Sequence, residues 1–236
     1  MLPDVSKIFG YLHHQAHSVE ARNIIFDCCE RNVDARLLDC GCNDGQIAIE
    51  VAQRIGTKDI WGIEVVEESA AKASERGIKV VRGDLNAPLP LETESFDVVH
   101  AANIIEHISN TDQFLREVHR ILKVGGYFLV STCNLAAFHN IFFLLLGRQP
   151  PPADVSDEFQ VGVWTTNKRR NAGGPCHRRV FTLKALEGLL ECHGFAVEKS
   201  LGSGFYPLPF LLARLMCKID KWHSAYLIIK AKKVNC

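Results

Sequence analysis

Short apolar segments alternate with amphipathic segments along residues 36–132, and this alternation is what most restricts the fold. Apolar runs typical of buried strands occupy residues 36–40, 59–65, 78–82, 96–100 and 127–132. Helical periodicity occupies residues 46–55, 67–76 and 112–122. Strands that alternate with helices form largely parallel sheets with helices on both faces. The sequence therefore predicts an α/β fold of the Rossmann-like, doubly wound type.

The alternation stops after Thr132 and returns near residue 182. Residues 147–179 are rich in proline and glycine, and a segment this long without periodicity is usually functional or disordered. Thr182 is a good N-cap for a helix over residues 183–192, and strands are expected at 195–201 and 225–232. These two strands complete a sheet of seven.

One methyltransferase-sized domain over residues 1–236 accommodates this order of elements. Within it we expect an N-terminal helical arm at residues 1–30 and a lid or substrate insertion at residues 133–181. His13, His14 and His17 in the arm have no acidic partner at metal-binding spacing. The apolar stretch at residues 210–216 is expected to be core or an interface helix, with a membrane-touching surface as the alternative.

Composition excludes several classes of function. The formal net charge is zero and the charged fraction is 23%, so nothing favours general binding of nucleic acid. Nine cysteines without a CxxC pair or zinc spacing indicate a reduced, cytoplasmic protein with buried thiols and no metal site. The longest apolar run, residues 141–146, is far below the ~20 residues of a membrane helix, and no signal-peptide core is present. The oligomeric state stays open, with a homodimer as one option.

The turn after the first predicted strand, Asp39 to Gly45, has the features of a nucleotide-binding turn. Gly41 and Gly45 lack a Cβ, so the backbone can bend tightly and approach a ligand closely. The next helix presents free N–H groups at its start. In an open α/β sheet, ligands bind at the carboxyl ends of the strands, where this turn lies.

Acidic residues near the turn determine which nucleotide fits. Asp39 and Asp44 would repel a pyrophosphate, whereas they suit the sulfonium and ammonium groups of S-adenosylmethionine. Glu64 lies about 20 residues beyond the glycines, the spacing of a ribose-binding acid. Asp84 could accept from the adenine amino group, and the N–H of Leu85 could bond a ring nitrogen. The glycine spacing and the acids disfavour a nicotinamide-dependent oxidoreductase.

Longer blocks of the sequence resemble the class I methyltransferases, in particular those of the type 11 group. The blocks are LLDCGCNDG, GIEV, GDLNAPLP, FDVVHAANIIEHI, FLREVHRILKVGGYFLVST and FTLKALEGLLECHGF. The resemblance extends from Arg36 to the C-terminus and implies a seven-stranded sheet, mostly parallel, with an antiparallel last strand. It also implies cofactor contacts by Asp39, Gly41, Cys42, Asn43, Gly45, Glu64, Val65, Asp84, Leu85, Asn103 and Ile104.

Asn43 departs from the family pattern, which commonly has glycine at this position. Asparagine tolerates the left-handed backbone conformation better than most residues. We therefore expect the turn to keep its shape.

A narrower resemblance concerns the acceptor side. The segment from Asn134 to Asn140, the following LLLGRQP and residues 177–183 are similar to one branch of the family. That branch includes methyltransferase-like proteins of methionine biosynthesis and small methyltransferases of glycan or lipid modification. The similarity implies a small or polar acceptor, of glycan or lipid type.

Three histidines are the candidate catalytic residues: His107, His139 and His177. A neutral imidazole can remove a proton near pH 7, so His107 is a candidate general base, with a packing and capping role as the alternative. His139 and His177 are candidate pocket groups.

Three further residues are assigned by their chemistry alone. Arg178 and Arg179 could bind an anionic acceptor, and a solvated surface pair is the competing interpretation. Cys133 is expected to be a buried structural thiol.

Two hypotheses follow from these observations. The first is transfer of the methyl group from S-adenosylmethionine by direct in-line displacement, for which the protein supplies binding, alignment and exclusion of water. The second is a regulatory partner that binds the cofactor, methylates nothing and activates another enzyme.

Overall fold

The computed structural model describes residues 15–163, 168–169 and 176–234, so His13 and His14 of the predicted arm lie outside the described residues. One large sheet organises the chain. Its strands are β1 (Arg36–Cys40), β2 (Asp59–Glu64), β3 (Lys79–Arg82), β4 (Phe96–Ala102), β5 (Leu122–Cys133), β8 (Phe195–Ser203) and β9 (Tyr226–Lys233).

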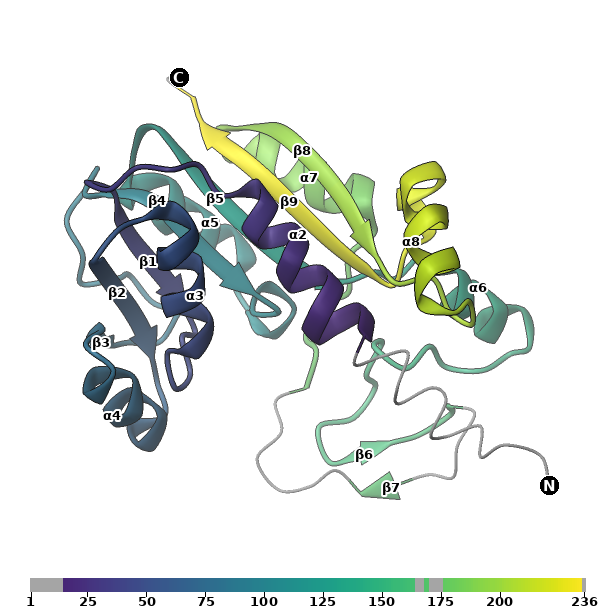
Figure 1. Cartoon of the computed structure of the whole chain (residues 1–236). Coiled ribbons are helices and arrows are strands. Elements are labelled where there is room, and N and C mark those ends of the chain that lie inside the picture. Colours follow the sequence, from purple (N-terminus) through teal and green to yellow (C-terminus); the bar gives the residue numbers. More distant parts are fainter. Residues whose placement is uncertain (1–14, 164–167, 170–175, 235–236) are drawn as a thin grey trace.

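The strand order across the sheet is β3-β2-β1-β4-β5-β9-β8. β9, the last strand in the chain, is inserted between β5 and β8 and runs antiparallel to both, whereas the other pairings are parallel (Figure 1). This topology confirms the predicted seven-stranded, mostly parallel sheet with an antiparallel last strand.

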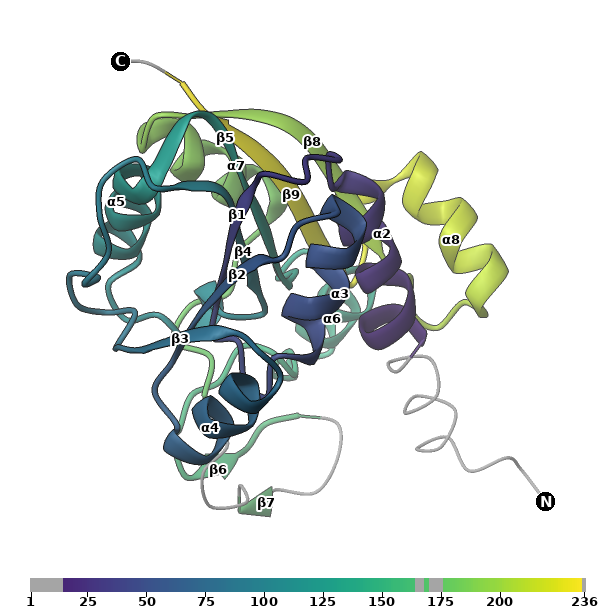
Figure 2. The same cartoon turned by 60° about the vertical axis from the view of Figure 1, so that its left-hand side comes forward.

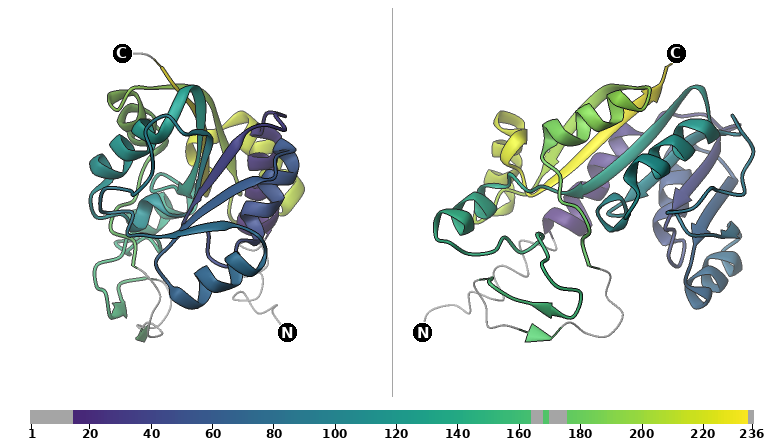
Figure 3. Two further views of the ribbon diagram at one scale, coloured as in Figure 1. Left: turned by 90° about the vertical axis from the view of Figure 1, so that its left-hand side faces the viewer. Right: turned by 180° about the vertical axis from the view of Figure 1, so that it is seen from behind.

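Helices cover both faces of the sheet. They are α2 (Ala21–Cys28), α3 (Gln46–Ile55), α4 (Glu67–Glu75), α5 (Thr111–Ile121), α6 (Phe138–Leu145), α7 (Leu183–Cys192) and α8 (Phe210–Ile219). Figures 2 and 3 show α5 and α7 on one face and α2 and α3 on the other. Short helical turns add η1 (Gln15–Glu20), η2 (Ile105–His107) and η3 (Lys221–His223).

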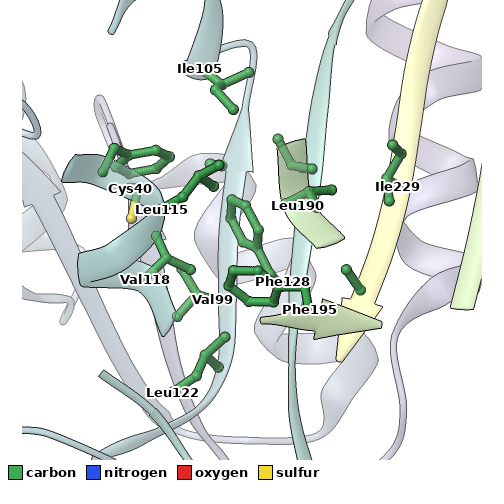
Figure 4. Close-up of a cluster of buried hydrophobic side chains, with 14 of the residues drawn as sticks. Cys40, Val99, Ile105, Leu115, Val118, Leu122, Phe128, Leu190, Phe195 and Ile229 are labelled. Atoms are coloured by element: carbon green, nitrogen blue, oxygen red, sulfur yellow. The ribbon is translucent and has the colours of Figure 1, made fainter. Parts of the chain in front are cut away.

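The larger core lies between the sheet and helices α5 and α7. Figure 4 shows Phe128 of β5 packed among Leu115 and Val118 of α5 and Leu190 of α7. A second core joins the opposite face of the sheet to α2 and α3. Two covered faces explain why the central strands are apolar along nearly their whole length.

Capping side chains and a glycine mark where three of these helix ends fall, and the cap by Thr182 confirms the prediction. The hydroxyl of Thr182 accepts a hydrogen bond from the N–H of Ala185 at 3.3 Å and so caps α7. Asn110 caps α5 in the same way, accepting from Gln113 at 3.2 Å. Gly56 follows α3 in the left-handed conformation.

The structure differs from the sequence prediction in three places. β5 begins at Leu122, five residues before the strand expected at residues 127–132, and it has an irregular register against β4. The predicted irregular segment contains a short hairpin of β6 (Phe159–Gln160) and β7 (Lys168–Arg169). α6 was not predicted, because nearly every residue in it is apolar and no polar face reveals a period.

Of the interpretations offered for residues 210–216, core is wrong, whereas an interface helix and a membrane-touching surface stay open. These residues form most of α8, in which only Ala213 and Cys217 are buried. None of the described helices is both long enough and apolar enough to cross a membrane.

Candidate functional site

The Gly-rich turn between β1 and α3 requires its glycines. Gly41 and Gly45 have φ angles of 71° and 81°, which side chains rarely adopt. A Cβ on Gly41 would also collide with Cδ1 of Ile104. The turn is therefore closely packed against the segment after β4, with Gly45 as the residue before α3.

Asn43 adopts the left-handed conformation, with φ of 47°. Its side-chain Oδ1 accepts a hydrogen bond from the hydroxyl of Ser69 at 2.9 Å. The expectation that asparagine keeps the shape of the turn is confirmed.

Glu64, the last residue of β2, joins that strand to the turn. Its Oε2 accepts a hydrogen bond from the N–H of Asn43 at 2.9 Å, and its Oε1 accepts from Val65 and Val66 at 2.8 Å each. The carboxylate is buried and held by three backbone donors. It lies beside the turn, as the predicted ribose contact requires.

Asp39 is buried near the end of β1 and contacts a residue that the sequence did not single out. Its Oδ1 lies 2.7 Å from Nδ1 of His100, which is directly opposite on β4. Nε2 of this buried histidine has no hydrogen-bond partner among the described residues. The pairing of Asp39 with His100 follows from the order of the strands. Because β4 pairs with β1, residues 39 and 100 become neighbours.

Two other acids contribute less negative charge to the cleft than their sequence positions indicate. Asp44 forms an ion pair with Arg76 of α4 at 2.9 Å, so its charge is compensated. Asp84 is exposed beyond β3, and its Oδ1 accepts from the backbone and side-chain N–H groups of Asn86 at 2.9 Å. The negative charge that favours a cationic cofactor in the cleft therefore comes from Asp39 and Glu64 more than from Asp44.

The remaining predicted cofactor residues lie around the same edge of the sheet. The side chain of Cys42 is buried against α3 and α4, and its backbone N–H and carbonyl bond Ile63 and Gly45, whereas Val65 is exposed. Leu85 and Ile104 pack partly on the main core. Asn103 follows β4 with a positive φ of 52°.

A cavity of about 390 Å³ lies beyond Asn103 and brings the three candidate histidines together. His107 comes from η2, His139 from α6 and His177 from the segment that leads to α7. The rings of His107 and His177 have centroids 4.9 Å apart. The remaining lining residues come from the ends of β5 and η2, α6, the proline-rich segment and the start of β9: Glu106, Cys133, Asn140, Pro151, Pro152, Tyr206, Ala225 and Tyr226.

Three buried polar atoms on residues that line this cavity have no hydrogen-bond partner among the described residues. They are Oε2 of Glu106, Nδ1 of His139 and Oδ1 of Asn140. Buried polar atoms in folded proteins are nearly always satisfied, so a cluster of unsatisfied ones indicates a polar ligand. Neither Glu106 nor Asn140 carries a sequence signal that marks it as a candidate catalytic residue.

Burial sets the protonation of these groups. It lowers the pKa of His139 to about 4, which makes this imidazole neutral and a weak base at pH 7. Burial raises the pKa of Glu106 above its usual range. Burial and the nearby Glu106 raise the pKa of the Cys133 thiol to about 12, in agreement with a structural thiol.

One group of side chains among the described residues has the spacing of metal ligands. Ligand atoms of Glu106, Cys133 and His177 all lie within 4.8 Å of one another. His177 also has Nδ1 2.8 Å from the carbonyl oxygen of Pro152. The sequence-based expectation of no metal site stays a prediction.

Arg178 and Arg179 do not line the cavity. The side chain of Arg178 pairs with Asp157 at 2.8 Å, and that of Arg179 donates to the carbonyl of Ser109 at 2.7 Å. Their backbone N–H groups donate to the carbonyl of Glu106 at 2.7 and 3.1 Å, which fastens the end of the insertion to η2. Of the two interpretations, the surface role agrees with this geometry.

Known proteins resemble this chain over most of its length. The family described as "Methyltransferase domain" matches residues 38–130. A probable S-adenosylmethionine-dependent methyltransferase of Mycolicibacterium smegmatis is 31% identical over 190 residues, which are 79% of this chain and 60% of that protein. A sterol 4-C-methyltransferase of Caenorhabditis elegans is 31% identical over 109 residues, 43% of this chain and 32% of that protein. The chain thus spans at most about 60% of the length of these relatives.

Solved structures share the fold. An S-adenosylmethionine-dependent methyltransferase from Mesorhizobium loti superposes with a TM-score of 0.63 at 20% identity, covering 92% of this chain and 98% of that one. One from Listeria monocytogenes, described as putative, gives a TM-score of 0.66 at 17% identity, covering 93% and 99%.

The inserted antiparallel β9 and the glycine turn tied to Glu64 define the class I, Rossmann-like methyltransferase architecture. Together with the matches in sequence, they show that the chain belongs to the class I S-adenosylmethionine-dependent methyltransferases. The cofactor of this family is S-adenosylmethionine.

Proposed function

We propose that this protein transfers a methyl group from S-adenosylmethionine to a polar group of a small, glycan-type or lipid-type acceptor. The observation that carries the proposal is the cavity of about 390 Å³, because it adjoins Asn103 and three of its lining residues have a buried, unsatisfied polar atom. An acceptor bearing hydroxyl or amine groups suits such a polar wall. The transfer is a direct in-line displacement at the sulfonium.

The chain's residues divide into a cofactor set and an acceptor set. Gly41, Asn43 and Glu64 shape the turn that receives the cofactor, with Asp39 beneath it. Residues 133–181 form the acceptor-side lid within one domain of residues 1–236.

The acceptor set consists of His107, His177 and Glu106. One of these residues receives the proton that the acceptor loses. Glu106 is the strongest candidate because its Oε2 is unsatisfied and burial raises its pKa. His139 orients the acceptor as a neutral group, since its pKa of about 4 makes it a poor base.

Similarity in sequence favours an acceptor with an apolar body. The relatives include proteins named sterol 4-C-methyltransferase and ubiquinone biosynthesis O-methyltransferase. The similarity to each of them spans only part of this chain and only part of the relative. The cavity lining combines tyrosines and prolines with polar groups, which suits an amphiphilic molecule. We place the reaction in the cytoplasm, since the eight described cysteines are free thiols.

Calorimetric titration with S-adenosylmethionine and with its demethylated product tests the cofactor part. Binding of both is expected, and no binding of either at millimolar concentration refutes the proposal. A screen of glycan and lipid acceptors with labelled cofactor tests the transfer. Glu106→Gln should lower the rate of transfer and leave the cofactor affinity unchanged.

The second candidate function is the regulatory partner that binds the cofactor without turnover. The resemblance of residues 134–140 and 177–183 to the methionine-biosynthesis branch supports it. Binding of cofactor without labelled product from any acceptor, together with activation of a co-purifying enzyme, would favour this function over transfer.

A further inference from the structure

Helices α6 and α8 carry a large exposed apolar surface at one end of the molecule. Leu145 of α6 is 79% exposed and Leu211 of α8 is 76% exposed. The other large apolar side chains exposed on these helices and the residues after them are Phe138, Ile141, Phe142, Leu144, Leu146, Leu212, Leu215, Ile219 and Trp222. Their exposed area is on the order of 1,000 Å², against the ~300–600 Å² of the largest patch on a typical monomer.

Phe205 connects the two helices, and we call the exposed apolar side chains of both the α6–α8 face. Phe138 of α6 stacks on Phe205 with ring centroids 5.7 Å apart. Phe205 in turn packs against Ala213 and Cys217 on the buried side of α8. Figures 1 and 3 show both helices at the same end of the molecule, near the point where β8 ends and β9 begins.

The pattern along α8 is that of a helix lying in a membrane interface. Leu211, Leu215 and Ile219 recur every four residues and make an exposed apolar stripe. The basic residues Arg214 and Lys218 are exposed and follow the same four-residue spacing, so they form a parallel edge.

Charged and aromatic groups continue this edge beyond α8. Lys221 and Trp222 follow the helix, with the ammonium of Lys221 5.7 Å from the centre of the Trp222 ring. The only acid in residues 210–222 is Asp220, which is 2.6 Å from His223. Apolar stripes edged by lysine, arginine and tryptophan bind at the headgroup level of bilayers and favour anionic lipids.

The inner side of α6 belongs to the acceptor cavity. His139 and Asn140 line that cavity, whereas Phe138, Phe142 and Leu145 of the same helix are exposed. One helix thus separates the acceptor site from the apolar surface. A surface held against a bilayer at α6 would place the cavity next to the lipid.

We propose that the α6–α8 face docks on the anionic surface of a lipid bilayer and that the acceptor is drawn from that bilayer. The apolar side chains enter the interface, and Arg214, Lys218 and Lys221 contact anionic headgroups. The docking is inferred from the α6–α8 face alone, whereas the supply of the acceptor from the bilayer rests on the proposed methyl transfer.

Flotation of the full chain with vesicles tests the docking. We expect co-flotation with vesicles of equal parts phosphatidylcholine and phosphatidylglycerol, and much less with phosphatidylcholine alone. Leu211→Ser with Leu215→Ser, and separately Phe142→Ser with Leu145→Ser, should weaken binding by about tenfold or more. Arg214→Gln and Lys218→Gln should each weaken it by about fivefold, and added salt should do the same.

Matched substitutions elsewhere control for general effects. Val33→Ser removes an apolar side chain that is exposed outside the α6–α8 face, and Lys184→Gln removes an exposed charge on α7. Both should float as the unmodified protein does. All variants should bind S-adenosylmethionine equally, which shows that they are folded.

Three results would overturn the docking: no flotation of the unmodified protein, flotation unchanged in the serine variants, or a dimer in light scattering that the serine variants dissociate. The last result would assign the surface to a second copy of the chain. If the unmodified protein floats with the vesicles but binds no S-adenosylmethionine, the proposed methyl transfer is refuted and the docking proposal stands.

Discussion

His100 on β4 holds the carboxylate of Asp39 on β1, with 2.7 Å between Nδ1 and Oδ1 and both side chains buried. Replacing His100 with Leu leaves a buried carboxylate without its partner. We expect this change to lower the free energy of unfolding by about 1–3 kcal/mol, measured by urea denaturation. The double variant with Asp39→Asn should recover part of the loss, and strictly additive losses would contradict the pairing.

Gly41→Ala should damage the turn through a specific collision. The new methyl group adds the strain of a left-handed residue, ~1–2 kcal/mol, to a clash with Cδ1 of Ile104. We expect weaker cofactor binding in calorimetry and a lower melting temperature. Ile104→Val, which removes Cδ1, should relieve part of the defect.

Gly125→Ala is the control for the Gly41 variant. Gly125 has a φ of 78°, and nothing lies within 4 Å of its added Cβ. The Gly125→Ala variant should have a lower melting temperature because of backbone strain. It should keep its affinity for the cofactor, because no clash accompanies the strain. Equal effects at both glycines would mean that contact with Ile104 is unimportant.

Glu64→Ala should weaken the binding of S-adenosylmethionine by about 2–4 kcal/mol, because the change removes the proposed ribose-binding carboxylate and frees three backbone donors that shape the turn. Calorimetric titration measures this loss. Glu67→Ala removes a nearby acid that is exposed on α4 and should have no effect on affinity. An unchanged affinity in the Glu64 variant would remove this residue from the site.

His139 should make the fold sensitive to mild acid. Its pKa in the folded protein is about 4, below that of an unfolded histidine near 6.5, so the unfolded chain takes up the proton first. Its contribution to stability is intact above pH 6.5 and is lost progressively as the pH falls towards 4, to a total of about 3 kcal/mol. Urea midpoints from pH 8 to 5 should fall less steeply for His139→Phe than for the unmodified protein, and equal slopes in the two proteins would contradict this contribution.

Cys133 should react slowly with iodoacetamide near pH 8. Burial and the nearby Glu106 raise its pKa to about 12, so almost none of it is thiolate. Cys192 is exposed and should be alkylated first. Mass spectrometry of digested samples over time gives the order, and early labelling of Cys133 would refute the structural assignment.

The architecture could be predicted from the sequence because the strands and helices from residue 36 to 132 have clear, different periods. α6 escaped prediction because a helix with apolar residues on nearly every side has no period to detect. β5 was expected to start five residues later, since Gly125 and Gly126 look like a turn but occupy an irregular part of the strand.

The candidate site was predictable where spacing along the chain determines it. Gly41, Asn43 and Glu64 meet because one strand-to-helix turn brings them to the same edge of the sheet. Contacts between distant segments were not visible in the sequence. Arg76 compensates Asp44 only because α4 returns beside the turn, and Glu106 enters the acceptor cavity only after residues 176–179 fold over η2.

Helix α6 contributes His139 and Asn140 to the acceptor cavity while its opposite side is exposed. Any ligand that immobilises the outer side of this helix therefore also reduces the conformational freedom of two cavity residues. By thermodynamic reciprocity, a molecule bound in the cavity must then strengthen attachment of the outer side by the same factor. The protein would hold a surface most firmly when its acceptor is in place and would release it after the methylated product leaves.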